Sequence, residues 1–298
     1  HMMKRTKKVI AIMSVLCVMG SFTMHADKVS AAEAATEQTT TESSKSMKKE
    51  VKSYSNGKKG LNKLKKKLKK QIKGYHGTHS IYVKNLDTNE WMVINNKKIR
   101  PASTIKLYNM ATVYDQISKK KMKESSYVKG QMKSMITVSS NDAYNNLLIK
   151  MGKGSPAKGI RMINKFCKKH GYKQTEAGGT LSPSSTRNTC WLLRSHTTVK
   201  DLGHILEDIY RGQCVSKSAS KKMLNYLKKQ QRKWKIPAGL PKGVKSANKT
   251  GEVKTFEHDA AIVFSRKADY IIVVMTDGDG AAISHIRSIS RTVYKYFN

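Results

Sequence analysis

The stretch Pro101-Ala-Ser-Thr-Ile-Lys-Leu-Tyr-Asn-Met110 combines the start of a helix with two reactive side chains. Apolar residues recur at helical spacing after it, which predicts a helix from about residue 103 to 118. Ser103 would open this helix, where the helix dipole and free N–H groups stabilise an oxyanion. Lys106 follows one turn later on the same face. A desolvated lysine loses proton affinity, so the pair predicts a nucleophile and its base.

Ser-x-x-Lys alone is a weak signal in this chain, because lysine is abundant. The same spacing recurs at Ser118, Ser155 and Ser246, among other serines. At such places a helix-capping serine with a surface lysine is the simpler interpretation. The position at the start of an apolar helix distinguishes Ser103 from the other matches.

Two further motifs follow in order along the chain, Ser140-Asn-Asp142 and Lys249-Thr-Gly251. The first precedes a predicted helix at 143–151. Its serine could relay a proton and its aspartate could bind the substrate amide or Lys106, although such clusters also cap helices. The second lies on a predicted strand, where Lys249 and Thr250 would face a carboxylate and Gly251 would let substrate backbone approach. Together the three motifs indicate serine acyl transfer.

The N-terminal part of the chain predicts export. Residues 1–31 combine a basic start, an apolar stretch and small residues near Ala31, which is typical of a cleaved secretory signal; a membrane anchor is the alternative. Residues 32–57 are rich in Thr, Ser, Glu and Lys and predict a flexible linker. One domain of 58–298 remains, and we expect a secreted, wall-associated monomer.

The rest of the chain predicts an α+β fold. The predicted elements run in the order helix (58–73), strands (79–86, 90–95), helices (103–118, 132–137, 143–151, 159–170, 199–210, 218–231), strands (246–253, 258–265, 269–276) and helix (281–297). Strands at both ends imply one antiparallel sheet flanked by helices, with an inserted all-helical lobe. The sheet lobe would comprise 58–100 and 232–298, and the helical lobe 101–231.

Cysteine and histidine spacing indicates no metal site and no cofactor. Cys167, Cys190 and Cys214 remain after cleavage, which allows at most one disulfide and leaves its existence open. The chain contains no Cys-x-x-Cys and no His-Glu-x-x-His.

The formal net charge of +38 requires either a partner or a structural explanation. An exported chain meets anionic wall polymers and lipid head groups in place of nucleic acid, so we expect no nucleic-acid partner. A solvated, solubilising lysine surface is the alternative to wall binding.

The three motifs and their surroundings resemble those of class A β-lactamases and the related D-Ala-D-Ala peptidases, from about residue 58 to 298. Arg100–Leu107 looks like the nucleophile helix of that family, and His258–Val263 looks like the strand beside its third motif. The resemblance implies Ser103 as nucleophile, Lys106 as base and Ser140 as proton shuttle. It also implies that Asp142 contacts the substrate amide and that Lys249 and Thr250 bind the carboxylate. The N–H groups of Ser103 and Glu252 would form the oxyanion hole.

Two departures from that family bear on turnover. The second motif reads Ser-Asn-Asp where class A enzymes usually have Ser-Asp-Asn. The segment 177–205 contains no Glu, and Asp201 is its only acid, whereas class A enzymes place there the Glu that activates the deacylating water. The sequence thus predicts acylation by β-lactams or D-Ala-D-Ala peptides with slow deacylation. A D-Ala-D-Ala carboxypeptidase or transpeptidase, and a wall-binding or β-lactam sensor module without turnover, remain the alternatives.

Overall fold

The computed structural model describes residues 57–182 and 194–298. The signal and linker predicted for residues 1–57 therefore lie outside the described residues, apart from Gly57 itself. The helices and strands follow the predicted order: α2 (Asn62–Ile72), β1 (Thr78–Asn85), β2 (Trp91–Ile94), the 3-10 helix η1 (Ala102–Ile105), α3 (Lys106–Ser118), α4 (Ser126–Thr137), α5 (Asn141–Met151), α6 (Pro156–Lys169), α7 (Val199–Tyr210), α8 (Lys217–Lys228), η2 (Pro237–Gly239), β3 (Lys245–Val253), β4 (Phe256–Phe264), β5 (Tyr270–Asp277) and α9 (Ala282–Phe297).

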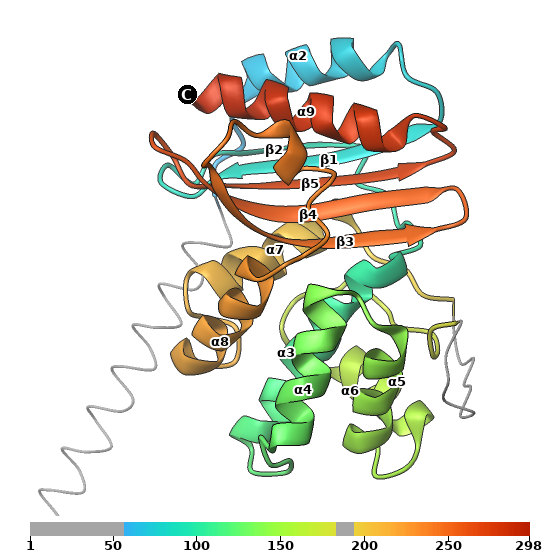
Figure 1. The fold of residues 1–298 in the computed structure, drawn as a ribbon. Coiled ribbons are helices and arrows are strands. Elements are labelled where there is room, and N and C mark those ends of the chain that lie inside the picture. Colours follow the sequence, from blue (N-terminus) through green and yellow to red (C-terminus); the bar gives the residue numbers. More distant parts are fainter. Residues whose placement is uncertain (1–56, 183–193) are drawn as a thin grey trace, which may run out of the picture. The chain divides into compact units, whose positions relative to one another are not determined.

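A five-stranded antiparallel sheet unites the two ends of the described chain (Figure 1). Its strand order is β2-β1-β5-β4-β3, so β1 pairs with β5 across almost 200 residues of sequence. The pairing is continuous from Thr78↔Asp277 to Asn85↔Tyr270. This arrangement confirms the predicted α+β class. It leaves β3 at one edge of the sheet, beside η1.

Helices α2 and α9 cover one face of the sheet (Figure 1). The lysine-rich helix α2 buries only a narrow apolar stripe, which includes Leu64 and Leu68. This stripe packs in one cluster with Ile289 of α9 and with Val274 of β5. The other faces of α2 remain exposed, as helical periodicity predicts for a surface helix.

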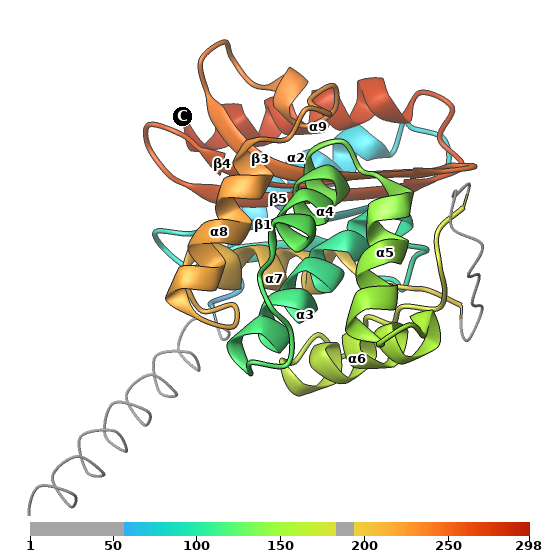
Figure 2. The same ribbon diagram turned by 60° about the horizontal axis from the view of Figure 1, so that its bottom comes forward.

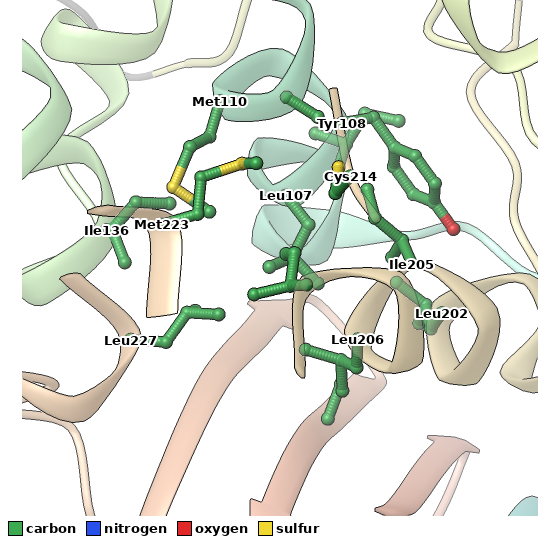
Figure 3. Packing of buried hydrophobic residues seen from close by; sticks show 14 of the residues in the cluster. Leu107, Tyr108, Met110, Ile136, Leu202, Ile205, Leu206, Cys214, Met223 and Leu227 are labelled. Carbon is green, nitrogen blue, oxygen red and sulfur yellow. The ribbon is translucent and has the colours of Figure 1, made fainter. Parts of the chain in front are cut away.

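The opposite face of the sheet shares one hydrophobic core with the helices of the middle segment (Figures 2 and 3). Figure 3 shows Leu107 of α3 beside Leu206 of α7 and Met223 of α8 in this cluster. Helix α7 lies directly on the sheet, because a Cβ on Gly203 would come within 2.3 Å of the Tyr82 ring. The sheet and the helical segment are therefore packed against each other through one continuous core.

Local details refine the predicted elements. Helix α4 begins at Ser126, six residues earlier than expected, because the Ser125 hydroxyl caps it by accepting a hydrogen bond from the Val128 N–H at 3.2 Å. Cys167 and Cys214 are buried free thiols, and Cys190 lies outside the described residues. In the described part of the chain, no helix is long and apolar enough to cross a membrane.

Candidate active site

Ser103 lies in η1, directly before α3. The preceding residue, Ala102, adopts a positive φ of 48°, a conformation that side chains other than glycine rarely take. Such strain persists where the surrounding structure enforces it, and it concentrates at functional sites. The Ser103 Oγ lies 2.9 Å from the Lys106 Nζ, so the predicted serine–lysine pair is in direct contact.

Lys106 is fully buried, and its amine is surrounded by neutral oxygens in the described structure. Besides Ser103, its Nζ donates to the Ser139 carbonyl at 2.6 Å and to the Asn141 Oδ1 at 2.7 Å. Burial lowers the pKa of Lys106 well below the usual lysine value, and the nearby charges of Lys249 and Arg232 lower it further. An amine in this setting can be neutral and accept a proton.

The hydroxyl that joins the lysines belongs to Ser139 and not to Ser140. The Ser139 Oγ lies 3.2 Å from the Lys106 Nζ and 2.9 Å from the Lys249 Nζ. Ser140 instead caps α5, where its Oγ accepts a hydrogen bond from the Ala143 N–H at 3.1 Å. The serine that contacts both lysines is thus one residue before the predicted Ser140.

The same one-residue shift applies to the amide contact. Asn141 reaches Lys106, whereas Asp142 lies in the first turn of α5, where its charge favours the helix N-terminus. The motif in space is therefore Ser139-x-Asn141, so this site has an amide where an acid was predicted. The cause is backbone geometry: Ser139 takes a positive φ of 63° at the end of the α4–α5 connection and turns its hydroxyl toward the lysines.

Strand β3 supplies the second buried lysine. The Lys249 Nζ donates to the Ser139 Oγ and to its neighbour's carbonyl, the Thr250 oxygen, at 2.8 Å. Burial, and next the charge of Arg232, lower the pKa of Lys249 to about 7, against the opposing effect of Asp259 and Glu252. Lys106 and Lys249 therefore both contact the Ser139 hydroxyl. Thr250 is buried beside Lys249 on the same strand.

Gly251 allows β3 to approach the nucleophile. A Cβ at this position would lie 2.9 Å from the Pro101 carbonyl oxygen, 3.1 Å from the Thr104 Cγ2 and 3.2 Å from the Ser103 nitrogen. The glycine of the third motif is thus required for contact between β3 and η1, in addition to its predicted role of admitting substrate backbone. It brings the backbone of Glu252 to the edge of the site.

Two cations near β3, Arg232 and Lys235, were not predicted from the sequence. Arg232 forms an ion pair with the Glu252 carboxylate and remains partly exposed. Lys235 is fully buried, pairs with Glu252 at 2.9 Å and donates to the Gly251 carbonyl at 3.3 Å. Nothing in the local sequence distinguishes these two cations from the many surface lysines and arginines, because only the fold places them beside β3.

Residues 181–182 contact the second motif and the helix that follows it. The side chain of the fully buried Asn145 holds Leu181 at both backbone groups: its Nδ2 donates to the carbonyl at 2.9 Å and its Oδ1 accepts from the N–H at 2.9 Å. The Asn141 Nδ2 donates to the Ser182 carbonyl at 3.4 Å. Residues 181–182 are thus the part of the described loop that contacts the motif residues.

Asp201, the acid that the sequence places in this region, is used elsewhere. Its Oδ2 accepts hydrogen bonds from the Thr175 hydroxyl at 2.7 Å and from the Gln174 N–H at 2.9 Å. Burial raises its pKa, against the lowering effect of these hydrogen bonds. Asp201 therefore anchors the segment before the loop and is not among the residues that contact Ser103, Lys106 or Lys249.

Comparison with known proteins agrees with this geometry. A family model described as the beta-lactamase enzyme family matches residues 63–131 and 127–297. The structure of PBP-A has a TM-score of 0.68 and 21% identity, covering 80% of this chain and 96% of that one. An ancestral class A β-lactamase has a TM-score of 0.67 and 19% identity, with 78% and 100% covered.

A β-lactamase from Sphaerobacter thermophilus gives a TM-score of 0.66 at 18% identity, with 76% of this chain and 94% of that one covered. At these identities the structures show a shared fold. No curated protein sequence matches the chain. The family model, however, covers most of the described residues, and the chain therefore belongs to the beta-lactamase enzyme family.

Proposed function

We propose that this protein is an exported serine hydrolase that is acylated at Ser103 by β-lactams or D-Ala-D-Ala peptides and deacylates slowly. The observation that carries the proposal is the 2.9 Å contact between the Ser103 Oγ and a fully buried Lys106 amine with a lowered pKa. Export rests on the sequence of residues 1–31 alone.

Acylation follows from the contacts of the two lysines. The neutral Lys106 amine takes the Ser103 proton as the oxygen attacks the carbonyl carbon. The N–H groups of Ser103 and Glu252 stabilise the oxyanion. As the C–N bond breaks, Ser139, in contact with both lysines, gives its proton to the leaving nitrogen and is reprotonated by the protonated Lys106. An acyl ester on Ser103 and a free amine result.

Substrate binding uses the cationic edge of the site. Lys249 and Arg232 would pair with the carboxylate of a β-lactam or of a terminal D-Ala, the Thr250 hydroxyl would donate to it, and Asn141 would offer an amide to the substrate. Ionic contacts to a carboxylate are strongest with desolvated or planar cations. The ion pairs of Glu252 with Arg232 and Lys235 keep the backbone of this edge in place.

Slow deacylation is supported by the loop contacts. Asn141 bonds to the backbone of Ser182, and Asn145 bonds to both the N–H and the carbonyl of Leu181. The side chain at the position that Asn145 holds is therefore that of a leucine. The segment 177–205 has no Glu, and Asp201 is bonded to Thr175 and Gln174. A water at Ser103 would therefore lack the loop carboxylate that accepts its proton.

The peptidase alternative uses the same acylation. A variant of PBP-A has been solved as an acyl-enzyme complex with penicillin G, and that protein shares this fold. A D-Ala-D-Ala carboxypeptidase or transpeptidase would likewise form a long-lived ester with a β-lactam. A module without turnover would stop at that ester, so peptide release, measured as free D-Ala, separates the enzymes from the sensor.

Covalent labelling tests the proposal. A fluorescent penicillin should label the protein at one equivalent, with the adduct mapped to Ser103 by peptide mass. Ser103→Ala should remove the label while the unfolding temperature changes little, since the side chain caps no helix with a hydrogen bond. Ser118→Ala, at a serine with the same Ser-x-x-Lys spacing, is the matched control and should label fully. Labelling of Ser103→Ala would refute the assignment.

Wall association rests on the exposed lysines of α2, including Lys63, Lys66 and Lys70. If they bind anionic wall polymer, retention on wall fragments should fall steeply with salt, because the Debye length shrinks from about 10 Å at 0.1 M to about 3 Å at 1 M. Replacing these three lysines by Gln should weaken retention more than the same change at Lys129, Lys158 and Lys221. Retention unaffected by salt would instead favour the solubilising interpretation.

A further inference from the structure

A cluster of two histidines and one aspartate lies on the sheet face that carries α2 and α9, away from the residues of the candidate active site. His79 comes from β1, Asp279 from the connection between β5 and α9, and His285 from the first turn of α9. His79 shares the side of β1 with Ile81 and Val83, which pack toward α2 and α9. The sequence analysis found no metal motif because these residues are up to 206 positions apart.

The donor atoms of the cluster converge on one point. The His79 Nε2 and the His285 Nδ1 lie 2.8 Å and 2.6 Å from the same oxygen, Asp279 Oδ2, and all three donor atoms fall within 4.8 Å of one another. Around a tetrahedral zinc ion with bonds of about 2.0–2.1 Å, ligand atoms are separated by roughly 3.3 Å. Shifts of well under 1 Å in the side chains would therefore produce that geometry.

Burial and orientation also suit a metal. The side chains of His79 and Asp279 are 2% and 1% exposed, whereas that of His285 is 24% exposed, so the cluster opens to solvent on one side. The Asp279 Oδ1 accepts the Ala281 N–H at 2.9 Å, which leaves Oδ2 for the two imidazoles. The Tyr75 ring stacks on His285 with centroids 3.5 Å apart and an angle of 7°, which fixes the imidazole plane. Such supporting contacts orient metal ligands in proteins.

The backbone brings these residues together at a close approach. Gly77 has a φ of 77°, and a Cβ there would lie 2.3 Å from the Asp277 carbonyl oxygen and 2.7 Å from the Asp279 nitrogen. Only glycine fits this contact between the start of β1 and the end of β5. The approach places His79 against the Asp279 carboxylate, which is buried with two imidazoles and a backbone amide as its partners.

We propose that His79, Asp279 and His285 bind one zinc ion that ties β1 to α9, with water in the fourth position. Two imidazoles and one carboxylate are a ligand set that favours zinc over magnesium or calcium, which prefer oxygen ligands. Each neutral imidazole would bind zinc through the nitrogen that now faces Asp279 and carry its hydrogen on the other ring nitrogen. The ion would lie apart from the catalytic cluster, because none of the three residues contacts Ser103 or either lysine there.

Zinc titration of the metal-free full chain tests the site. With a chromophoric chelator as competitor, the protein should take up one tight equivalent of Zn²⁺, and Co²⁺ should give the visible bands of a tetrahedral complex. His285→Ala should abolish this uptake. Tyr75→Leu should weaken it roughly 10–100-fold, the usual effect of losing a supporting contact. His204→Ala, which removes a histidine paired with Asp208 at 3.6 Å, is the matched control and should bind normally.

Stability provides the second readout. Zinc should raise the unfolding temperature of the unmodified chain and of His204→Ala but not that of His285→Ala, because a ligand of the native state stabilises it. His285 is partly exposed, so its replacement by Ala leaves the core intact. Absence of a tight equivalent, or uptake that is undiminished in His285→Ala, would overturn the proposal. The cluster would then be a hydrogen-bonded His–Asp–His arrangement that holds β1 and α9 without metal.

Discussion

The two sides of Ser103 differ sharply in chemistry. On one side, Lys106 contacts the Ser103 Oγ at 2.9 Å, and Lys106 and Lys249 both contact the Ser139 hydroxyl, at 3.2 Å and 2.9 Å. On the loop side, the residue held by Asn145 is Leu181, and the acid of that segment, Asp201, is bonded elsewhere. The first side supplies what attack and leaving-group protonation need. The segment 177–205 contains no Glu that could activate water in the proposed mechanism.

In the proposed mechanism, acylation and deacylation therefore depend on separate structural elements. The acylating groups come from η1, α3, the α4–α5 connection and β3, all of which are locked by the shared core. A group that activates the deacylating water would have to come from the loop that the side chains of Asn141 and Asn145 hold by hydrogen bonds. A family fold can therefore retain the first step while the second is lost or slowed.

The largest expected effect after loss of Ser103 concerns the serine of the second motif. Ser139→Ala should slow acylation by about 10²–10⁴-fold, the range for loss of a proton-transfer group. Stopped-flow labelling with a chromogenic β-lactam measures this rate. Ser140→Ala is the matched control: it should acylate within a few-fold of the unmodified protein while losing about 1 kcal/mol of stability with the cap of α5. The reverse order of effects would contradict the one-residue correction.

A carboxylate can be introduced into the loop at Leu181, the residue whose backbone Asn145 holds. Leu181→Glu should accelerate ester hydrolysis by up to about 10²–10⁴-fold, because it would place a carboxylate where Asn145 holds the loop against the site. The lifetime of the adduct, followed by intact mass, measures the change. Leu224→Glu, at another partly buried leucine of the same core, should leave that lifetime unchanged. Equal acceleration in both variants, or none in either, would show that Leu181 does not mark the water position.

A smaller effect is expected from pH. Lys249 must be protonated to bind a substrate carboxylate, and its pKa of about 7 means that the free site loses this charge as pH rises through 7. Lys106 must be neutral to accept the Ser103 proton, so its protonation at low pH should lower the acylation rate. The acylation rate constant divided by the dissociation constant should thus be bell-shaped, with the alkaline decline near pH 7.

Lys249→Arg should shift that alkaline decline upward, since arginine keeps its charge. The profile of labelling rate against pH, taken at subsaturating β-lactam, is the measurement. If the labelling rate of Lys249→Arg still declines near pH 7, a group other than Lys249 causes the decline.

Most of the fold could be predicted from the sequence, because the apolar periodicity of each element survives its packing. The helix at 199–210 and the strands near 246–276 agree closely with α7 and with β3, β4 and β5. The start of α4 was missed, because its first turn has little apolar periodicity and is set by the Ser125 cap.

The sequence predicted the candidate site correctly only where the residues in contact belong to the same short stretch of chain. Ser103 and Lys106 share one helical turn, so spacing places them in contact. The choice between Ser139 and Ser140 depends on a positive φ at Ser139, which the sequence of two adjacent serines does not reveal. Arg232 and Lys235, and likewise the His79–Asp279–His285 cluster, are brought together by the pairing of distant strands and helices.

The most direct test of the central claim is the fate of the Ser103 ester in the unmodified protein. After mixing with a chromogenic β-lactam, the account predicts a burst of one equivalent followed by a slow steady state. Intact mass should show the adduct persisting after excess β-lactam is removed. Burst-free, rapid hydrolysis with no detectable adduct would contradict it. Another group would then be activating the water, because residues 177–205 contain no Glu and Asp201 is bonded to Thr175 and Gln174.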